Sequence, residues 1–189
     1  MIRAGTSGRL LALASLVLLV SCDASSGGAT SDEGRGSGVP ESWQELEVRW
    51  HVDGDTVGVR ALEDGPAGRR GEETPVRLLE IDTPEVHPER ECFGPEAAAE
   101  LARLLPRGSS VWGERDEELR DPYGRTLLYL YADVPGDGDP GPVMVNLHLV
   151  RNGYAESVLF RPNDLHIDEI RRAEQQARSD GVGLWGACR

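Results

Sequence analysis

The stretch RLLEIDTPE, residues 77–85, passes from an apolar strand into an acidic turn, and it decides the fold that we expect for the chain. In an extended strand, side chains alternate between two faces, which puts Arg77 on one face and Asp82 on the other. The two side chains can converge only if the chain bends near Asp82. Arg77 has apolar neighbours, so its charged group needs a partner or a ligand. An internal salt bridge and a role in function both satisfy that need.

A second acidic stretch, DGDT at residues 53–56, stands at the start of another expected strand. Hard cations such as Ca²⁺ and Mg²⁺ bind carboxylate and carbonyl oxygens, which acidic residues at strand ends can provide. Each acidic stretch is also typical of a turn, because Asp-Gly favours hairpins and a residue before proline is held extended. The residues by themselves leave a cation site and two ordinary turns open.

Working outward, alternating apolar residues predict strands at residues 46–52, 56–62 and 76–81, and two more strands are expected at residues 109–114 and 126–132. Apolar spacing predicts a helix that begins at Gly94 and is stopped by Pro106, and two more helices at residues 144–152 and 165–178. Asn163 or Asp164 is placed to cap the last helix. Five strands with interspersed helices indicate an α+β fold with a small β-barrel, although composition does not choose it over other α+β folds.

The amino-terminal residues have the pattern of an export signal. Two arginines precede an apolar run at residues 10–20, which is too short for a membrane-spanning helix of about 20 residues. The segment LVSC at residues 19–22 resembles a bacterial lipobox, so we expect residues 1–21 to be a lipoprotein signal peptide and Cys22 to be lipidated. An ordinary signal peptide with a chance cysteine is the alternative. With the lipobox, the protein is expected to be exported and lipid-anchored to a bacterial membrane on the extracytoplasmic side.

Composition then separates a tether from one folded domain. Residues 22–40 are mostly Ser, Gly and acidic residues, which cannot bury enough apolar surface to offset the entropy of ordering, so we expect a flexible tether. Residues 41–189 remain as a single domain with one core. The formal net charge of −13 argues against binding a polyanion by bulk electrostatics. A nucleic-acid site on this chain would need a local arginine cluster and a bound cation.

Two cysteines remain if Cys22 carries the lipid. Cys92 and Cys188 are then expected to form a disulfide, because an exported protein folds in an oxidising compartment. In the chain-entropy description, closing so long a loop stabilises the fold by about 4–5 kcal/mol. A metal site built from His87 and Cys92 is the competing interpretation, and it lacks the CxxC spacing of such sites.

Four motifs, in order along the chain, resemble those of the staphylococcal nuclease-like (thermonuclease) family: DGDTV at 53–57, RLLEIDTPE at 77–85, GPEA at 94–97 and DPYGR at 121–125. The later RPN at 161–163 and GLW at 183–185 also fit. A single DGDT would carry little weight, but four linked motifs in order are a specific signal. The resemblance covers about residues 48–185, nearly the whole expected domain.

This resemblance implies an OB-fold five-stranded β-barrel with three helices. It also implies a calcium-dependent nuclease that hydrolyses phosphodiester bonds of DNA or RNA and leaves 3′-phosphate ends. In the family's arrangement, one Ca²⁺ is held by the residues matching Asp55 and Asp82 and by the backbone carbonyl matching Thr83. Asp53 is expected to orient these ligands or water.

The same resemblance assigns the reacting groups. Glu85 is expected to act as the general base toward water, while Arg77 and Arg125 hold the phosphate and stabilise the transition state. Tyr123 is expected beside the nucleotide. The expected partners are a nucleic acid substrate and, through the lipid anchor, a membrane; the chain is expected to be a monomer.

The chain departs from the family pattern at two positions that concern substrate binding. Pro122 stands where the best-known member has a lysine that reaches a terminal phosphate, and Val158 stands where it has a tyrosine that stacks on the base. The rival hypothesis is a non-catalytic, lipid-tethered OB-fold module that binds calcium, an oligonucleotide or a protein. The acidic net charge favours this rival, whereas retention of all five expected catalytic and metal-binding side chains favours the enzyme.

Overall fold

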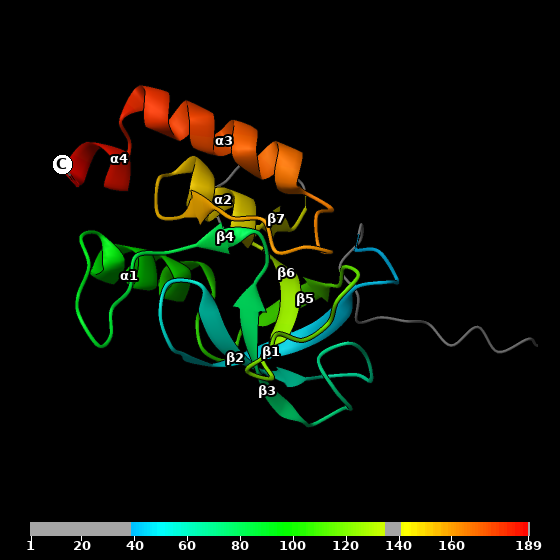
Figure 1. Ribbon diagram of the computed structural model, residues 1–189. Coiled ribbons are helices and arrows are strands. Elements are labelled where there is room, and N and C mark those ends of the chain that lie inside the picture. The colour runs from blue at the N-terminus through cyan, green and yellow to red at the C-terminus, as the bar shows by residue number, and fades with distance from the viewer. Residues whose placement is uncertain (1–38, 135–140, 189) are drawn as a thin grey trace, which may run out of the picture. The chain divides into compact units, whose positions relative to one another are not determined.

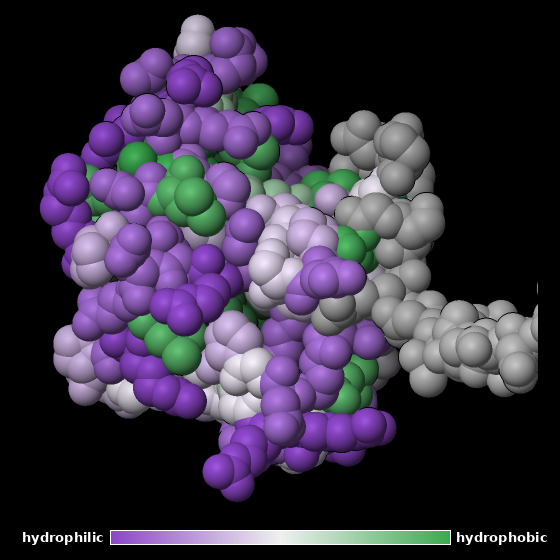
Figure 2. Space-filling model, turned by 90° about the vertical axis from the view of Figure 1, so that its right-hand side faces the viewer, coloured by the Kyte–Doolittle hydropathy of each residue, from purple (hydrophilic) through white to green (hydrophobic). Residues whose placement is uncertain are grey.

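The computed structural model describes residues 39–134 and 141–188. The predicted signal peptide, Cys22 and nearly all of the predicted tether therefore lie outside the described residues. None of the helices in these two ranges is long and apolar enough to cross a membrane. The face shown in Figure 2 is largely hydrophilic, with apolar residues scattered over it.

Five strands form a closed, mixed β-barrel (Figure 1): β1 Gln44–His51, β2 Thr56–Ala61, β3 Glu73–Leu78, β5 Ser110–Glu114 and β6 Thr126–Ala132. Neighbouring strands pair antiparallel in the order β3-β2-β1-β5-β6. The barrel closes where β3 pairs with β6 in parallel, with Arg77 opposite Leu127. Three main helices accompany the barrel, so the predicted α+β fold, a five-stranded barrel with three helices, is confirmed.

The helices are α1 Gly94–Leu104, α2 Val145–Arg151 and α3 Ile167–Asp180, and a four-residue helix, α4 Leu184–Ala187, follows them. Short strands complete the sheets: β7 Val143–Met144 pairs antiparallel with β6, and β4 Ile81–Asp82 pairs antiparallel with β8 Glu156–Ser157. α2 packs against both β6 and α3, so it lies between α3 and the barrel (Figure 1).

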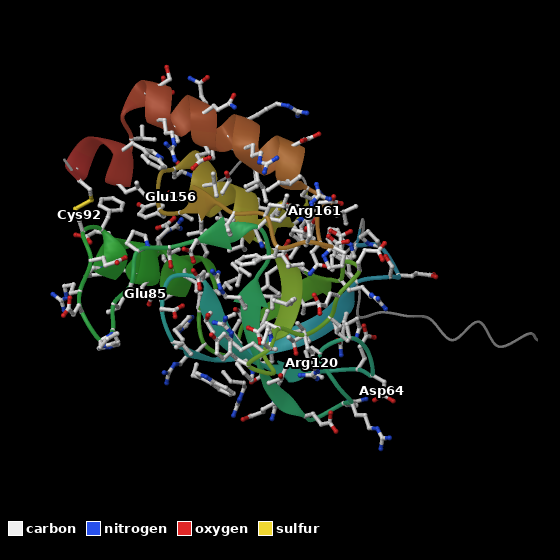
Figure 3. The ribbon with its side chains drawn as sticks, viewed as in Figure 1. Asp64, Glu85, Cys92, Arg120, Glu156 and Arg161 are labelled. Atoms are coloured by element: carbon white, nitrogen blue, oxygen red, sulfur yellow. A yellow bond between two sulfur atoms is a disulfide. The ribbon has the colours of Figure 1, made fainter. Side chains whose placement is uncertain are left out.

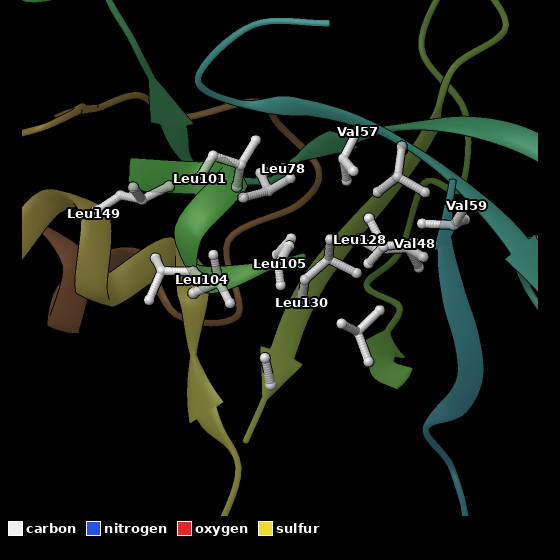
Figure 4. Packing of buried hydrophobic residues seen from close by; sticks show 14 of the residues in the cluster. Val48, Val57, Val59, Leu78, Leu101, Leu104, Leu105, Leu128, Leu130 and Leu149 are labelled. Atoms are coloured by element: carbon white, nitrogen blue, oxygen red, sulfur yellow. The ribbon is translucent and has the colours of Figure 1, made fainter. Parts of the chain in front are cut away.

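The barrel core is filled by aliphatic side chains from the strands and from one face of α1 (Figure 4). Leu101 and Leu104 of α1, with the following Leu105, lie against Leu78 and Leu128 of the two strands that close the barrel. Each fully buried leucine contributes roughly 1.5–3 kcal/mol by removal of apolar surface from water. Packing of this kind fixes α1, and with it the loop that precedes α1, against the strands that carry the candidate site.

One predicted strand is wrong in a way that matters for the site. Residues 76–81 were expected as a single strand, but β3 ends at Leu78, and Leu79 and Glu80 form a turn before β4 begins. Glu80 has a φ of 62°, in the left-handed region that non-glycine residues seldom adopt. This bend is the condition under which Arg77 and Asp82 can face each other.

The predicted cap of the last helix is also wrong. The residue at the N-cap of α3 is His166, and no side chain caps it in the manner expected of Asn163 or Asp164. Asn163 is fully buried and instead forms two hydrogen bonds with the backbone of Glu118, accepting from its N–H at 2.7 Å and donating to its carbonyl at 3.0 Å. Pairing the buried side-chain amide of Asn163 outweighs capping, because an unpaired buried polar group costs about 1–3 kcal/mol.

The predicted disulfide is confirmed. Cys92, just before α1, is bonded to Cys188, just after α4, across 96 residues of sequence. The competing metal site of His87 and Cys92 is excluded, because the sulfur of Cys92 is already used. The bond joins the loop that leaves β4 to the carboxyl-terminal end of the described chain.

Candidate active site

Arg77 is the centre of the candidate site. Its Nη1 lies 2.9 Å from Asp55 Oδ2 and its Nη2 lies 2.6 Å from Asp82 Oδ1. The side chain is only 7% exposed, as is that of Asp55, whereas Asp82 is 62% exposed. The bend at Leu79–Glu80 therefore places Asp82 on the same guanidinium as Asp55, and the charged group within an apolar strand has two acidic partners.

Asp55 is held in place by the turn that begins the acidic stretch at 53–56. Its Oδ2 accepts hydrogen bonds from the backbone N–H and the hydroxyl of Thr83, at 2.9 and 3.0 Å. Its backbone N–H donates to Asp53 Oδ1 at 3.1 Å, so Asp53 orients the turn. A Cβ on Gly54 would come within 2.8 Å of Thr83 Oγ1, so only glycine allows the two acidic stretches to approach this closely.

The charge balance at Asp55 is unfavourable for a carboxylate. Burial raises the pKa of Asp55 to about 6; the neighbouring Arg77 opposes the shift and the charge of Asp53 adds to it. A cation beside this carboxylate would offset both burial and the repulsion from Asp53, and would favour the ionised form.

These residues fit a hard cation by donor type. Within residues 39–134 and 141–188, no group of three or more acidic, histidine or cysteine side chains is arranged to hold a metal ion. The predicted calcium site has only two such side chains, the carboxylates of Asp55 and Asp82, and adds one backbone carbonyl. Such a set leaves coordination positions of the cation for water or phosphate oxygens. Since Asp55 and Asp82 both contact Arg77, a cation would share its two carboxylates with that guanidinium. Calcium binding by Asp55, Asp82 and Thr83 stays a prediction.

Arg125 lies at the end of the loop between β5 and β6 and is fixed by its neighbours. Its Nε donates to Asp121 Oδ2 at 2.6 Å, and its backbone N–H donates to Asp121 Oδ1 at 2.8 Å. Burial alone would raise the pKa of Asp121, but the hydrogen bonds from Arg125 outweigh it and lower that pKa. Asp121 is therefore a stable anionic partner that sets the orientation of the guanidinium.

A single hydroxyl connects the two predicted phosphate-binding arginines. Thr56 Oγ1 donates to Asp55 Oδ1 at 3.2 Å and accepts from Arg125 Nη1 at 3.4 Å. Asp55 in turn contacts Arg77. The path from Arg77 through Asp55 and Thr56 to Arg125 consists of direct contacts, so both guanidinium groups lie at one site.

Both arginines line a pocket of about 300 Å³. Its other lining residues include two aromatic side chains, Tyr123, which is 86% exposed, and Phe160. The Cζ atom of Arg125 lies 5.7 Å from the ring centroid of Tyr123, and that of Arg77 lies 5.7 Å from the ring centroid of Phe160. The pocket thus combines cationic donors suited to a phosphate with apolar rings suited to a planar group.

Phe160 and its neighbour Arg161 were not predicted as pocket residues. The sequence comparison pointed instead to Val158, which does not line the pocket and whose backbone N–H donates to the carbonyl of Glu80. Phe160 follows Val158 by two positions, and alternation in an extended segment would have placed both on one face. The sequence signal that could have identified Phe160 is therefore an aromatic residue two positions after Val158, on the same face of an extended segment.

Glu85 is not brought to the pocket in the same way. Its side chain is exposed, it does not line the pocket, and its backbone N–H and carbonyl form hydrogen bonds with Glu91 at 2.8 and 2.9 Å. Figure 3 shows Glu85 on the α1 side of the molecule, whereas Arg161 and Arg120 lie on the other side of β4. The predicted general base therefore lies close to Asp82 and Thr83 in sequence, on a loop of its own.

Comparison with known proteins is consistent with this geometry. The family of staphylococcal nuclease homologues matches residues 75–187, a range that includes Arg77, Asp82 and Arg125. Endonuclease YncB of Bacillus subtilis (strain 168) is 32% identical over 138 residues, which are 71% of this chain and 58% of that protein. Protein ParB of Escherichia coli is 36% identical over 147 residues, 76% of this chain and 75% of that protein.

A third relative matches over a greater length. Thermonuclease of Staphylococcus hyicus is 27% identical over 183 residues, 95% of this chain and 96% of that protein. The chain thus spans nearly all of one relative and less than two thirds of YncB. With its closed barrel, its three main helices and the match over residues 75–187, the chain belongs to the family of staphylococcal nuclease homologues.

Proposed function

We propose that this protein is a nuclease that hydrolyses phosphodiester bonds of DNA or RNA in the pocket between Arg77 and Arg125. Membership of the family, and the likeness to proteins named endonuclease and thermonuclease, support nuclease activity. The single observation that carries the proposal is the chain of contacts from Arg77 through Asp55 and Thr56 to Arg125, because it holds two guanidinium groups at one pocket.

The two arginines suit phosphoryl transfer. A phosphodiester gains negative charge on its equatorial oxygens in the transition state, and fixed N–H donors stabilise that charge most when they need no reorientation. Arginine stays charged at any working pH and can bind two oxygens at once. Arg77 is held by two acids and Arg125 by Asp121, so both are oriented before substrate arrives.

In the proposed reaction, Asp55, Asp82 and the carbonyl of Thr83 hold one Ca²⁺, which supplies Lewis-acid polarisation of the phosphate and of water when bound. Glu85 takes a proton from the attacking water as its oxygen bonds to phosphorus. The bond between phosphorus and the 5′ oxygen breaks, Arg125 donates a hydrogen bond to the leaving oxygen, which takes up a proton, and a 3′-phosphate remains.

Glu85 can fulfil this role from an exposed loop. Hydrogen bonds of a general base are often incomplete without substrate and form only in the reacting complex. The loop of Glu85 begins at Thr83, which is anchored on Asp55, and ends at Cys92, which is anchored by the disulfide. The proposal therefore requires the loop between these two anchors to bring the side chain of Glu85 to the pocket.

The acidic chain also favours a second candidate, a non-catalytic module that binds nucleic acid or another ligand in the same pocket. The exposure of Glu85, and its absence from the pocket lining, favour binding without cleavage. Retention of Asp55, Asp82, Arg77, Arg125 and Glu85 favours the nuclease. The two candidates differ in one observable: whether a bound oligonucleotide is cut.

The expected result is degradation of end-labelled single-stranded DNA or RNA by the purified protein with Ca²⁺, and at least a tenfold loss of rate after chelation, because the acid pair then lacks its cation. Initial rates are measured by gel, and phosphatase sensitivity of the new ends tests for 3′-phosphate. The Glu85→Gln variant should bind the oligonucleotide and cut it slowly. Binding without cleavage by the wild type at any Ca²⁺ concentration would identify the binding module instead.

We further propose that the protein acts outside the cytoplasm, attached to a membrane by a lipid on Cys22, as a monomer. The lipobox-like segment at residues 19–22 and the disulfide between Cys92 and Cys188 support this location, since disulfides persist in oxidising compartments. Metabolic labelling with a fatty acid, compared between the wild type and Cys22→Ser, tests the anchor. Equal labelling of both proteins would reject it.

A further inference from the structure

The proposed reaction leaves Glu80 without a role, although this residue lies between Arg77 and Asp82. Glu80 is fully buried, with 0% of its surface exposed. A carboxyl group in such a position is costly unless it is bonded to something. Its φ of 62° adds strain, which persists only where the surrounding structure demands it. Burial and strain together indicate that the bend at Leu79–Glu80 needs this side chain.

The carboxyl group of Glu80 lies against two elements other than its own turn, α3 and β6. Its Oε1 accepts a hydrogen bond from the backbone N–H of His166, the N-cap residue of α3, at 3.4 Å. The hydroxyl of Tyr129, on β6, approaches the same carboxyl but donates to Asp116 Oδ2 at 3.1 Å. Glu80 Oε2 has no complete hydrogen bond to any described residue. The Tyr129 hydroxyl therefore has two carboxyl groups beside it and donates to that of Asp116.

The backbone of the bend at Leu79–Glu80 also forms hydrogen bonds with three other segments. Asn146 of α2 donates to the carbonyl of Leu79 at 2.8 Å, and the N–H of Leu79 donates to the carbonyl of Leu128 at 3.0 Å. The N–H of Val158 donates to the carbonyl of Glu80 at 2.9 Å. These bonds fix the turn to α2, β6 and the segment after β8, while the side chain of Glu80 connects it to the N-cap residue of α3.

The bend decides where Asp82 lies. Asp82 is largely exposed, and it forms an ion pair with Arg77 at 2.6 Å. On a continuous strand it would face away from Arg77. We propose that Glu80 is a positioning residue, whose buried carboxyl group ties the bend to α3 and so holds Asp82 against Arg77 in the geometry that the proposed nuclease reaction uses.

The matched variants separate the two contributions of Glu80. Glu80→Gly relieves the positive φ but removes the carboxyl group, so strain alone cannot explain its effect. Glu80→Gln keeps both the length of the side chain and an acceptor for the N–H of His166. Glu80→Asn tolerates the left-handed backbone and is too short to reach His166, so it serves if Glu80→Gly does not fold. Glu114→Gln is the control, because Glu114 contacts the side chain of His166 at 2.9 Å without touching the bend.

With single-stranded DNA and Ca²⁺, we expect Glu80→Gly to lower kcat roughly tenfold with KM changed less than threefold, because the displaced group acts on the transition state. Glu80→Gln and Glu114→Gln should stay within about threefold of the wild type. Ca²⁺ titration by calorimetry without substrate should show weaker binding for Glu80→Gly and Glu80→Asn. A crystal structure of either variant should show Asp82 separated from Arg77.

The distance from Asp82 to Arg77 is independent of the proposed function, because measuring it needs neither turnover nor calcium, whereas kcat and the calcium titration rest on that function. An inactive wild type with Asp82 displaced in Glu80→Gly would reject the nuclease and keep the positioning role. A folded Glu80→Gly or Glu80→Asn protein with Asp82 still on Arg77 overturns the positioning role. So does a loss of kcat in Glu114→Gln equal to that in Glu80→Gly.

Discussion

Replacing Arg125 by alanine is expected to lower kcat by roughly 10²–10³-fold, the usual cost of removing one preorganised donor from a developing oxyanion. The guanidinium of Arg125 is held by Asp121 and Thr56, so it is already fixed at the pocket before substrate binds. Because the lost contact is made to the transition state, KM should change much less than kcat. Initial rates on single-stranded DNA with Ca²⁺ measure both parameters.

Two further variants make this result specific. Arg125→Lys keeps the charge but not the planar pair of donors, so we expect it to recover only part of the lost rate. Arg171→Ala removes an exposed arginine of α3 and should leave kcat within about twofold, which controls for the loss of one positive charge. Circular dichroism establishes that each variant is folded. A folded Arg125→Ala protein with the wild-type kcat would contradict the role assigned to this residue.

Removing the disulfide is expected to have the largest effect on stability. The bond between Cys92 and Cys188 closes a loop across 96 residues, which restricts the unfolded chain by about 4–5 kcal/mol in the entropy description. For a domain of this size that loss lowers Tm by roughly 8–20 °C. Calorimetric unfolding of the oxidised wild type and of a Cys92→Ser, Cys188→Ser double variant measures the difference.

Reductant provides the internal control for the disulfide. Treatment of the wild type should reproduce the Tm of the double variant, and the same treatment should not change the double variant. Assays well below both Tm values then report on the loop that ends at Cys92 and carries Glu85. An unchanged Tm after complete reduction would show that packing of α4, through Leu184 and its neighbours, is sufficient to hold that end of the chain.

Much of the fold could be predicted because its strands and helices follow simple periodicities. The alternating pattern at residues 46–52 and the apolar face of the helix beginning at Gly94 both lead to elements with nearly the predicted bounds. The closed barrel itself was predicted from the resemblance, since alternation alone does not say which strands pair. The parallel closure between β3 and β6 depends on contacts distant in sequence.

The bend at Leu79–Glu80 could not be predicted from local signals. Neither residue is Gly, Pro, Asn or Asp, so nothing in the pair marks a turn. The bend forms because distant groups, Asn146 on α2 and the amino end of α3, satisfy its polar atoms. The predicted cap of α3 failed for a related reason, since Asn163 pairs with the distant backbone of Glu118 instead.

The acidic residues and the arginines of the candidate site could be predicted from the sequence, but the aromatic residues that line its pocket could be predicted only in part. Arg77 and Asp82 were recognised as residues whose meeting required a bend, and the structure supplies that bend. Phe160 was not predicted, because the resemblance to the family places the position of the stacking aromatic residue at Val158. Aromatic walls depend on which side of an extended segment faces the pocket, which is set by tertiary contacts such as the one between Val158 and Glu80.

The parallel pairing of β3 with β6 has a consequence for how this protein tolerates change. Arg77 lies opposite Leu127, and Leu127 follows Arg125 by two residues. The distance between the two guanidinium groups is therefore set by the hydrogen bonds between β3 and β6 and not by loops. Lengthening the connection between β2 and β3 would leave that distance as it is. Inserting one residue into β3 or β6 would turn the side chains of that strand to the opposite face of the sheet. This one change would separate the two arginines.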